Sequence, residues 1–247
     1  MRGFANILIG LSALACATPA LAQDDEGQEI IVTASRTLAG YRGDGEPMAV
    51  AVKPAPALRL RRTADFAVQS VRIIGDTRDE AKRREEIYAM LKGAITLAGK
   101  HGVELATGDY IVEPLTLANY RNLTLEEDDN REDAEEATFL VKTPLVKGAD
   151  AKAALDRITN FVKAVPAVGR AEIEAEGDLT LSVVGPDQYR GQIIDLVAAD
   201  AAKTAAKFGP DFSVTASGLD RPVEWSRVGL TEVSLYLPVS YSVVPKP

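Results

Sequence analysis

Few side chains in this sequence combine the residue types and spacing that chemistry needs. His101 is the single histidine, so a Ser-His-Asp arrangement or a zinc site would have to use it. It follows a long amphipathic stretch and precedes Gly102, a position where a helix end favours a positive group. Residues 40–45 are glycine-rich but lack the flanking strand and helix of a phosphate loop. We therefore predict no catalytic residues, no cofactor and no metal, and a protein that is not an enzyme.

Carboxylates gather at residues 126–136, the one place where the sequence offers ligands for a cation. Hard cations such as Ca²⁺ take several carboxylate oxygens, which Asp128, Asp129 and Asp133 could supply. The run lacks the spacing and the glycine of an EF-hand loop. Because like charges repel and stay in solvent, we expect instead a solvated hairpin tip between strands at 103–112 and 137–145.

The first 22 residues have the features of a secretory signal peptide. Arg2 precedes an apolar run at 7–15 that is too short to span a bilayer, and the small-x-small site Ala20-Leu21-Ala22 follows. The single cysteine, Cys16, lies inside this segment, where lipid anchoring is an alternative to cleavage after Ala22. We expect export to the periplasm, with possible attachment to the outer membrane, of a chain that holds itself together without disulfides.

Charge and composition exclude several partners. The chain has 28 basic and 36 acidic residues, for a net charge of −8, which becomes −9 when the segment containing Arg2 is removed. Such a balance argues against broad affinity for nucleic acid or anionic lipid. No stretch after the signal segment is apolar enough to cross a membrane, and 46% apolar residues can fill a sizeable core.

An apolar island at residues 29–36 (EIIVTASR) interrupts the polar, glycine-dotted tail at 23–46. Its β-branched residues favour an extended chain, which can gain affinity by pairing with another strand. The island resembles the TonB box of TonB-dependent outer-membrane receptors, although this chain is too short for their plug and barrel. The resemblance implies TonB or an outer-membrane protein as partner, bound through Glu29, Ile30, Ile31, Val32 and Thr33. The alternative is a first strand that docks on the protein's own sheet.

Hydrophobic periodicity predicts helices between strands. Residues 66–74 form a strand, and Thr77 with Glu80 predicts the capping box of a helix that ends at Gly102. Asp150 is expected to cap a second helix. A third helix should bury one apolar side, formed by Tyr189, Ile193, Leu196, Val197, Ala201, Ala205 and Phe208.

Residues 230–244 alternate apolar and polar side chains along their whole length. A strand has a side-chain period of two, so we predict one long strand with Val233, Leu235, Leu237, Val239, Tyr241 and Val243 towards a core. The order of elements predicts an α+β domain over residues 47–247. We expect a mixed or largely antiparallel sheet, completed by this strand, with about three helices packed on one face.

The order of these patterns resembles a SIMPL domain, a family of exported bacterial proteins. The resemblance rests on residues 64–68 (ADFAV) leading into a long helix, on the alanine-rich third helix, and on residues 235–241 (LYLPVSY) as a closing strand. It spans roughly residues 54–244, and the acidic loop is longer than usual for the family. It implies a cell-envelope protein that self-associates, and it assigns no catalytic residue.

The leading functional hypothesis is therefore a non-enzymatic, exported protein of the cell envelope that acts through protein contacts or self-assembly. A TonB-linked accessory of outer-membrane transport, acting through residues 29–36, is the first alternative. An envelope hydrolase or ligand-binding protein is the second, and it requires a deep pocket with convergent polar groups.

Overall fold

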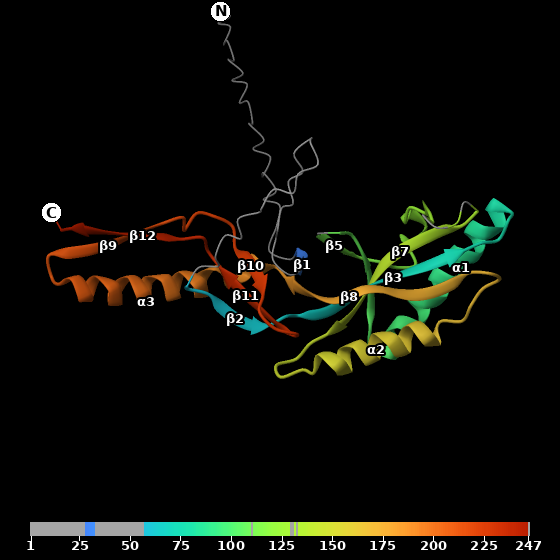
Figure 1. Cartoon of the computed structure of the whole chain (residues 1–247), viewed down its shortest axis with the longest axis horizontal. Coiled ribbons are helices and arrows are strands. Elements are labelled where there is room, and N and C mark those ends of the chain that lie inside the picture. The colour runs from blue at the N-terminus through green and yellow to red at the C-terminus, as the bar shows by residue number, and fades with distance from the viewer. Residues whose placement is uncertain (1–27, 33–56, 110, 129–130, 132, 247) are drawn as a thin grey trace, which may run out of the picture.

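The computed structural model describes residues 28–32, 57–109, 111–128, 131 and 133–246. The expected signal segment, with Cys16, lies outside these residues, as do Thr33 and Asp129. Strands hold 39% of the described residues and helices 32%. The protein has a barrel from which a narrower arm projects (Figure 1).

Six antiparallel strands close the barrel. In order around the ring they are β3 (Phe66–Gly75), β8 (Glu172–Val184), β1 (Glu29–Val32), β5 (Ile111–Pro114), β4 (Glu104–Thr107) and β7 (Glu135–Pro144). The ring closes because β7 also pairs with β3, and the short β6 (Glu126–Glu127) extends the far end of β7. The prediction of an α+β sheet with helices on one face is therefore wrong: the fold is dominated by a closed barrel.

Two features of the chain curl the sheet into a ring. Gly177 adopts a positive φ of 64° within β8, and the pairing of β8 with β3 shifts there, between Val68 and Ser70. Such a bulge bends and twists a strand. The short β1 then pairs with β8 on one side and β5 on the other, which joins the two edges of the curled sheet.

Helices α1 (Glu80–Ala98) and α2 (Ala151–Ala164) cover the outer side of β3, β7 and β8. Their apolar faces meet the strands in the largest core of the protein, where Phe139 and Phe161 are almost fully buried. Asp150 caps α2 as predicted, and Gly102 takes the predicted left-handed conformation after η2 (Gly99–His101). The predicted capping box is wrong, because Asp79 caps α1.

The stretch 230–244 is not the single strand that its alternation predicts. It divides into β11 (Glu232–Tyr236), which lies between β10 (Glu224–Arg227) and β2 (Leu60–Thr63), and β12 (Ser240–Pro245), which pairs with β9 (Phe212–Ser217). The division falls at Pro238, which has no N–H for a ladder, and the Val239 N–H turns back to the Leu237 carbonyl oxygen at 2.8 Å. Neither half belongs to the barrel sheet, so this stretch does not complete it.

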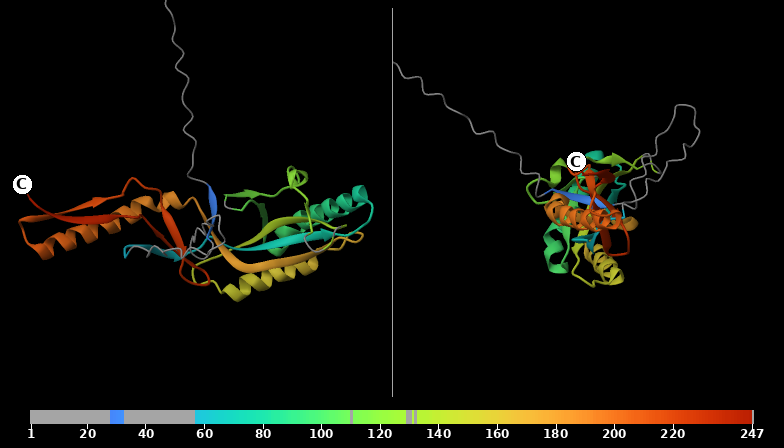
Figure 2. Two further views of the ribbon diagram at one scale, coloured as in Figure 1. Left: turned by 45° about the horizontal axis from the view of Figure 1, so that its top comes forward. Right: turned by 90° about the vertical axis from the view of Figure 1, so that its left-hand side faces the viewer.

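The arm consists of helix α3 (Arg190–Phe208) and the two-stranded ribbon of β9 and β12. Figures 1 and 2 show it extending away from the barrel, with the three-stranded sheet at its root. Two short 3₁₀ helices, η3 (Tyr120–Asn122) and η4 (Pro186–Tyr189), complete the described elements. Helix α3 packs on the ribbon, whereas α1 and α2 pack on the barrel, so the three helices do not share one face.

Candidate functional site

The residues predicted to bind a partner are part of the barrel wall. Glu29–Val32 is strand β1, and all four residues are buried. Thr33 lies outside the described residues. The segment thus takes the place that the alternative interpretation gave it, on the protein's own sheet. A TonB-type partner could pair with it only after it leaves the barrel, and such binding stays a prediction.

One face of the barrel strands points into the lumen, and the pairing register identifies it. The opposite face of β4 and β7, with Leu105 and Phe139, packs against α1 and α2. Residues paired across antiparallel strands share a face. The luminal face therefore includes Phe66, Val68, Lys142, Glu104, Ser182, Ile31, Glu29 and Val112.

A buried polar cluster occupies this lumen. The Lys142 Nζ forms an ion pair with Glu29 Oε2, and Ser182 Oγ donates a hydrogen bond to Glu29 Oε1. Lys142 also lies 3.3 Å from Glu104 Oε2 and 4.1 Å from the centre of the Phe66 ring. A charge taken out of water must be paired in this way, because an isolated one is strongly destabilising.

The luminal cluster resembles catalytic machinery only in its residue types. Ser182 has no exposed surface, and Glu29 and Lys142 are less than a tenth exposed, so no substrate reaches them in this conformation. The hydroxyl of Ser182 donates to a carboxylate that is already paired with an ammonium. The cluster therefore fixes strand β1 in the barrel. Sequence inspection missed Lys142 and Ser182, although a lysine at an inward position of the apolar strand β7 was a detectable signal.

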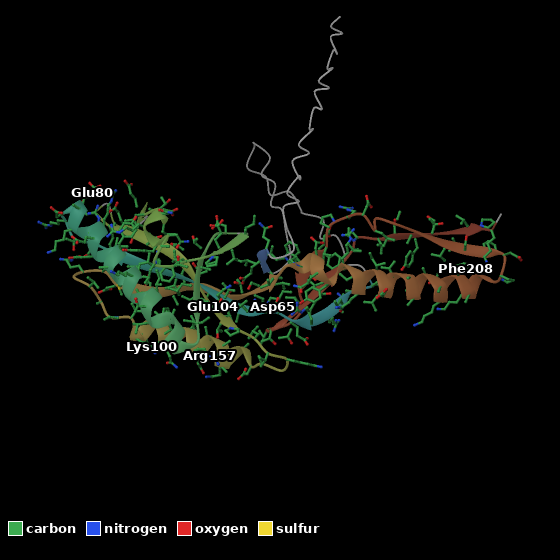
Figure 3. All side chains as sticks on the ribbon, turned by 180° about the vertical axis from the view of Figure 1, so that it is seen from behind. Asp65, Glu80, Lys100, Glu104, Arg157 and Phe208 are labelled. Atoms are coloured by element: carbon green, nitrogen blue, oxygen red, sulfur yellow. The ribbon has the colours of Figure 1, made fainter. Side chains whose placement is uncertain are left out.

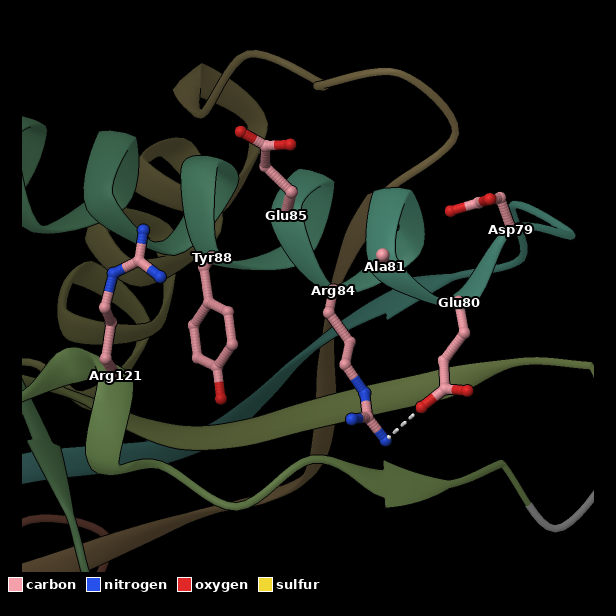
Figure 4. A pocket seen from close by; sticks show the side chains of 7 residues that line it. All are labelled: Asp79, Glu80, Ala81, Arg84, Glu85, Tyr88 and Arg121. Carbon is pink, nitrogen blue, oxygen red and sulfur yellow. Dashed lines mark ion pairs between the residues drawn. The ribbon is translucent and has the colours of Figure 1, made fainter.

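An open cavity of about 660 Å³ lies along the first turns of α1 (Figure 4). In its lining Arg84 forms an ion pair with Glu80 at 2.9 Å, and the Arg121 guanidinium lies 5.7 Å from the centre of the Tyr88 ring. Its lining holds no serine, threonine, cysteine, histidine or lysine. This cavity therefore gives no positive support for the hydrolase alternative, which stays a prediction.

Ion pairs tie α1 to the end of the barrel beside this cavity. Burial opposes the charged form of Glu135, but hydrogen bonds from Arg84 and Arg83, both at 2.8 Å, outweigh it and hold the pKa of Glu135 below its usual value. A hydrogen bond from Thr77 lowers the pKa of Glu86, helped by the Arg170 backbone N–H. These shifts favour ions that are already paired, which is typical of structural salt bridges.

The other predicted chemistry is not assembled by the fold. His101 stacks edge-on against Phe161 with ring centres 5.9 Å apart, at the end of α1 where a helix terminus was expected. Within the described ranges, no three His, Cys, Asp or Glu side chains are grouped to hold a metal ion. Asp129 of the acidic run falls outside those ranges, so the calcium hypothesis is untested. None of the helices in the described part of the chain is long and apolar enough to cross a membrane.

The arm is the region where the sequence expectation and the fold differ most. Of the apolar side predicted for α3, only Ile193 and Val197 are buried. Leu196 is 39% exposed and Phe208 53% exposed, and Figure 3 shows Phe208 at the far end of the arm. No residue in 198–217 or 240–246 is buried. The outer arm therefore has no core of its own.

The two strands of the arm differ in how their free edges are protected. Strand β12 ends in Pro245, which has no N–H to offer a further strand, whereas its other residues, 240–244, carry no charge. Strand β9 has the sequence FSVTAS, with no proline and no charge, and in the described part of the chain it pairs only with β12. The edge of β9 is therefore open to another strand.

The two faces of this ribbon also differ. Tyr241 donates a hydrogen bond to the Val197 carbonyl oxygen of α3 at 3.0 Å, so its face, which it shares with Ala216 and Val214, lies against the helix. Thr215 and Ser242, which are register partners, lie on the opposite, exposed face. A polar face and a free edge leave the ribbon accessible from the side away from α3.

Comparisons with known proteins give no family for this chain. No family model and no curated protein match it. A solved structure of an uncharacterized conserved protein from Listeria innocua shows a likeness at 14% identity, over 75% of this chain and 94% of that one, with a TM-score of 0.15. A TM-score so low supports no inference. The resemblance to SIMPL domains stays a prediction.

Proposed function

We propose that this protein is a non-enzymatic, exported protein of the cell envelope that works by self-association through its arm. The observation that carries the proposal is that the outer arm is an ordered helix and ribbon without a single buried side chain. An isolated two-stranded ribbon is at best marginally stable in water, and it gains stability from further strands or a covering surface. The exposed rings of Phe208 and Phe212, 6.4 Å apart at the tip, are apolar surface that a partner can cover.

A second copy of the chain fits this surface better than an unrelated partner. The free edge of β9 is uncharged, so two β9 strands can pair antiparallel about a two-fold axis and make one four-stranded sheet. Pro245 removes one N–H from the edge of β12, so the edge of β9 is the better one for pairing, and pairing through this edge alone makes a closed dimer. The predicted signal segment at residues 1–22 and the SIMPL-like order of elements in the sequence support the envelope location in this proposal.

The test places a charge on the edge of β9 and compares it with the same charge on the edge of β12. Thr215 lies near the middle of β9, so in the proposed dimer two lysines at Thr215→Lys would stand almost opposite each other and repel. Ser242→Lys is the matched control, because Ser242 is the register partner of Thr215 on the same exposed face. We expect light scattering to show dimers for the unsubstituted chain and for Ser242→Lys, and monomers for Thr215→Lys.

A strictly monomeric unsubstituted chain at all concentrations would refute the proposal. So would equal association of the two lysine variants, because the contact would then not involve the edge of β9. The TonB-linked alternative makes a different demand: β1 must leave a buried place in the barrel before it can pair with another protein. Titration of the full chain with the carboxy-terminal domain of TonB tests that alternative directly.

A further inference from the structure

Strand β1 is held in the barrel by few backbone pairings. It pairs with β8 along its whole length, but with β5 only through Glu29 and Ile30. By contrast, β3 and β7 pair from Phe66 to Gly75. The joint of β1 with β5, like that of β4 with β5, has only two register pairs, so the ring opens most easily at these two joints. Departure of β1 would expose the edges of both β8 and β5.

The place that β1 occupies selects a carboxylate. Lys142 and Ser182 are both buried and both bond to the carboxylate of Glu29, at the first residue of the strand. Without that carboxylate, the exposed Glu104 would be the one anionic neighbour of the Lys142 ammonium among the described residues. A buried charge without its partner is strongly disfavoured, so the place must be filled by a strand that begins with an acid.

The same place selects branched apolar residues after the acid. Ile31 points into the lumen, where it packs with Ala106, Val112 and Leu140. Ile30 and Val32 point outwards and pack with Leu181, Val183 and Val233. Together these contacts define a strand-acceptor site for an extended peptide with an acid followed by three branched apolar residues. We name it the β1 site.

We infer that the β1 site is exchangeable, and that in the assembled protein it holds residues 29–32 of a second copy. This inference builds on the proposed self-association. A second copy carries the same four residues, so it makes the same contacts, and domain swapping of this kind costs little beyond the tether. Residues 33–56, 24 in number, connect β1 to the next described residue and can reach about 80 Å if extended.

Association through the arm would raise the local concentration of the second copy's tail. Once two copies are joined, insertion of that tail is intramolecular within the dimer, and its effective concentration can rival that of the chain's own tail. The exchanged strand then adds a second link between the copies. This link does not involve the arm, so it can be measured separately.

A disulfide between two chains reports the exchange. Ile30 and Ile111 are register partners on β1 and β5, a spacing within the range that a disulfide can bridge. In chains with Cys16→Ser, no other cysteine is present. One chain carries Ile30→Cys and a second, distinguishable in size by a tag, carries Ile111→Cys. The two are refolded together, oxidised and separated on a non-reducing gel.

We expect a covalent dimer that contains both chains, and none from either chain alone. The double variant Ile30→Cys/Ile111→Cys, refolded alone and at high dilution, is the control that the two positions meet. A disulfide in that control without any mixed dimer would overturn the exchange. Absence of the disulfide even in the control would overturn the β1 site itself.

The selection of a carboxylate gives a second, independent readout. Adding Glu29→Gln to the chain with Ile30→Cys should lower the yield of mixed dimer several-fold, because an amide does not neutralise Lys142. An unchanged yield would contradict the role of the carboxylate. All of these readouts use barrel residues, so a mixed dimer from the Thr215→Lys chain would preserve the exchange while the proposed arm contact fails.

Discussion

The barrel and the arm contain similar sequence patterns, but they differ in whether strand edges are paired and helix faces are buried. Each has a long helix with an apolar stripe against antiparallel strands. In the barrel the strands close into a ring, so no long edge is free, and the stripes of α1 and α2 are buried. In the arm, the ribbon of β9 and β12 stays open, and α3 is buried only near its start, at Ile193 and Val197.

The difference in burial between these helices shows that an amphipathic pattern indicates which side of a helix is apolar, but not which other element covers that side. Helix α1 is covered by strands of its own chain. Helix α3 has alanines and Phe208 in its outer turns, and within the described part of the chain nothing buries them. We therefore interpret the core between α1, α2 and the strands β3, β7 and β8 as complete within one chain, and the outer arm as the part that the proposed self-association would cover.

The largest contrast is expected from truncating one phenylalanine in each region. Phe139 is 1% exposed in the core between barrel and helices, whereas Phe208 is 53% exposed at the tip of the arm. Phe139→Ala should reduce the free energy of unfolding by about 3–5 kcal/mol, as for other buried phenylalanines. Phe208→Ala should change it by less than about 0.5 kcal/mol in the monomer, as for surface residues.

Urea unfolding at a concentration where the protein is monomeric measures both values. A cost for Phe208→Ala as large as that for Phe139→Ala would mean that the arm has a core of its own. The comparison between the two regions would then be wrong.

The luminal ion pair gives the next largest effect. In Lys142→Ala, Ser182 would be the one side-chain partner left to the buried Glu29 within the described part of the chain, so the change should cost about 3–5 kcal/mol, the range for breaking a buried pair from one side. Lys152→Ala is the control: Lys152 pairs with Asp156 at 2.6 Å, but both side chains are more than half exposed, so we expect about 0–1 kcal/mol. Equal urea midpoints for the two variants would show that the cluster does not fix β1.

A smaller effect is expected where α1 meets the loop before β8. Gly169 has a φ of +59°, and a Cβ there would lie 2.2 Å from the carboxylate of Glu86, which Thr77 and the Arg170 N–H hold in place. Gly177 has a similar φ of +64° but open space around it. Both alanine variants carry the backbone cost of about 1–2 kcal/mol, and only Gly169→Ala adds the clash. Thermal unfolding should therefore rank Gly169→Ala below Gly177→Ala, and the reverse order would exclude the close packing of Glu86.

Local structure was predictable from the sequence where a single turn or cap decides it. Neighbouring residues alone predict Asp150 as the cap of α2, Gly102 as the left-handed residue and a strand at residues 66–74, where the structure has β3 (Phe66–Gly75). The capping box failed because the helix begins two residues later than the box predicts: Asp79 accepts from the Lys82 N–H, and Thr77 donates to the Glu86 carboxylate instead. Propensity does not rank two capping residues so close in sequence.

Long-range pairing was not predictable in the same way. The alternation of residues 230–244 continues through Pro238, because a period of two says which side chains share a face but not which strand lies beside them. The missing N–H of Pro238 was the available signal for the break. The closure of the barrel depends on β1, which pairs with residues more than 80 positions away in sequence, and no local pattern encodes such a partner.

For the functional site, the sequence indicated the right segment and missed its surroundings. Residues 29–32 stood out as an extended island, and they do form a strand. Lys142 and Ser182, which bind Glu29, lie on two other strands, so only the fold brings the three together. The open edge of β9 depends equally on which strands are absent beside it, and a single chain's sequence does not contain that information.

The smallest expected effect is a pH dependence at the end of the barrel, where adjacent carboxylates have opposite shifts. Burial works against ionised Glu135, but Arg84 and Arg83 keep its pKa below the usual 4.5; burial raises the pKa of Glu136, with Arg72 only partly opposing it. A carboxylate with a lowered pKa stabilises the fold above the unfolded value and loses that contribution as pH falls below about 4.5. A raised pKa has the opposite sign, because protonation then favours the folded state.

Glu135→Gln should therefore make stability fall less steeply than in the unsubstituted chain as pH drops from 4.5 towards the lowered pKa. Glu136→Gln should make stability fall more steeply as pH drops towards 4.5 from above. In the unsubstituted chain, Glu136 takes up a proton in the folded state over this range and so adds stability, and the variant lacks this contribution. Urea unfolding across this range, with each variant compared with the unsubstituted chain, measures both slopes. If both variants changed the pH dependence of stability in the same direction relative to the unsubstituted chain, the assignment of Arg83 and Arg84 to Glu135 would be wrong. The ion pairs that tie α1 to the barrel would then be wrong as well.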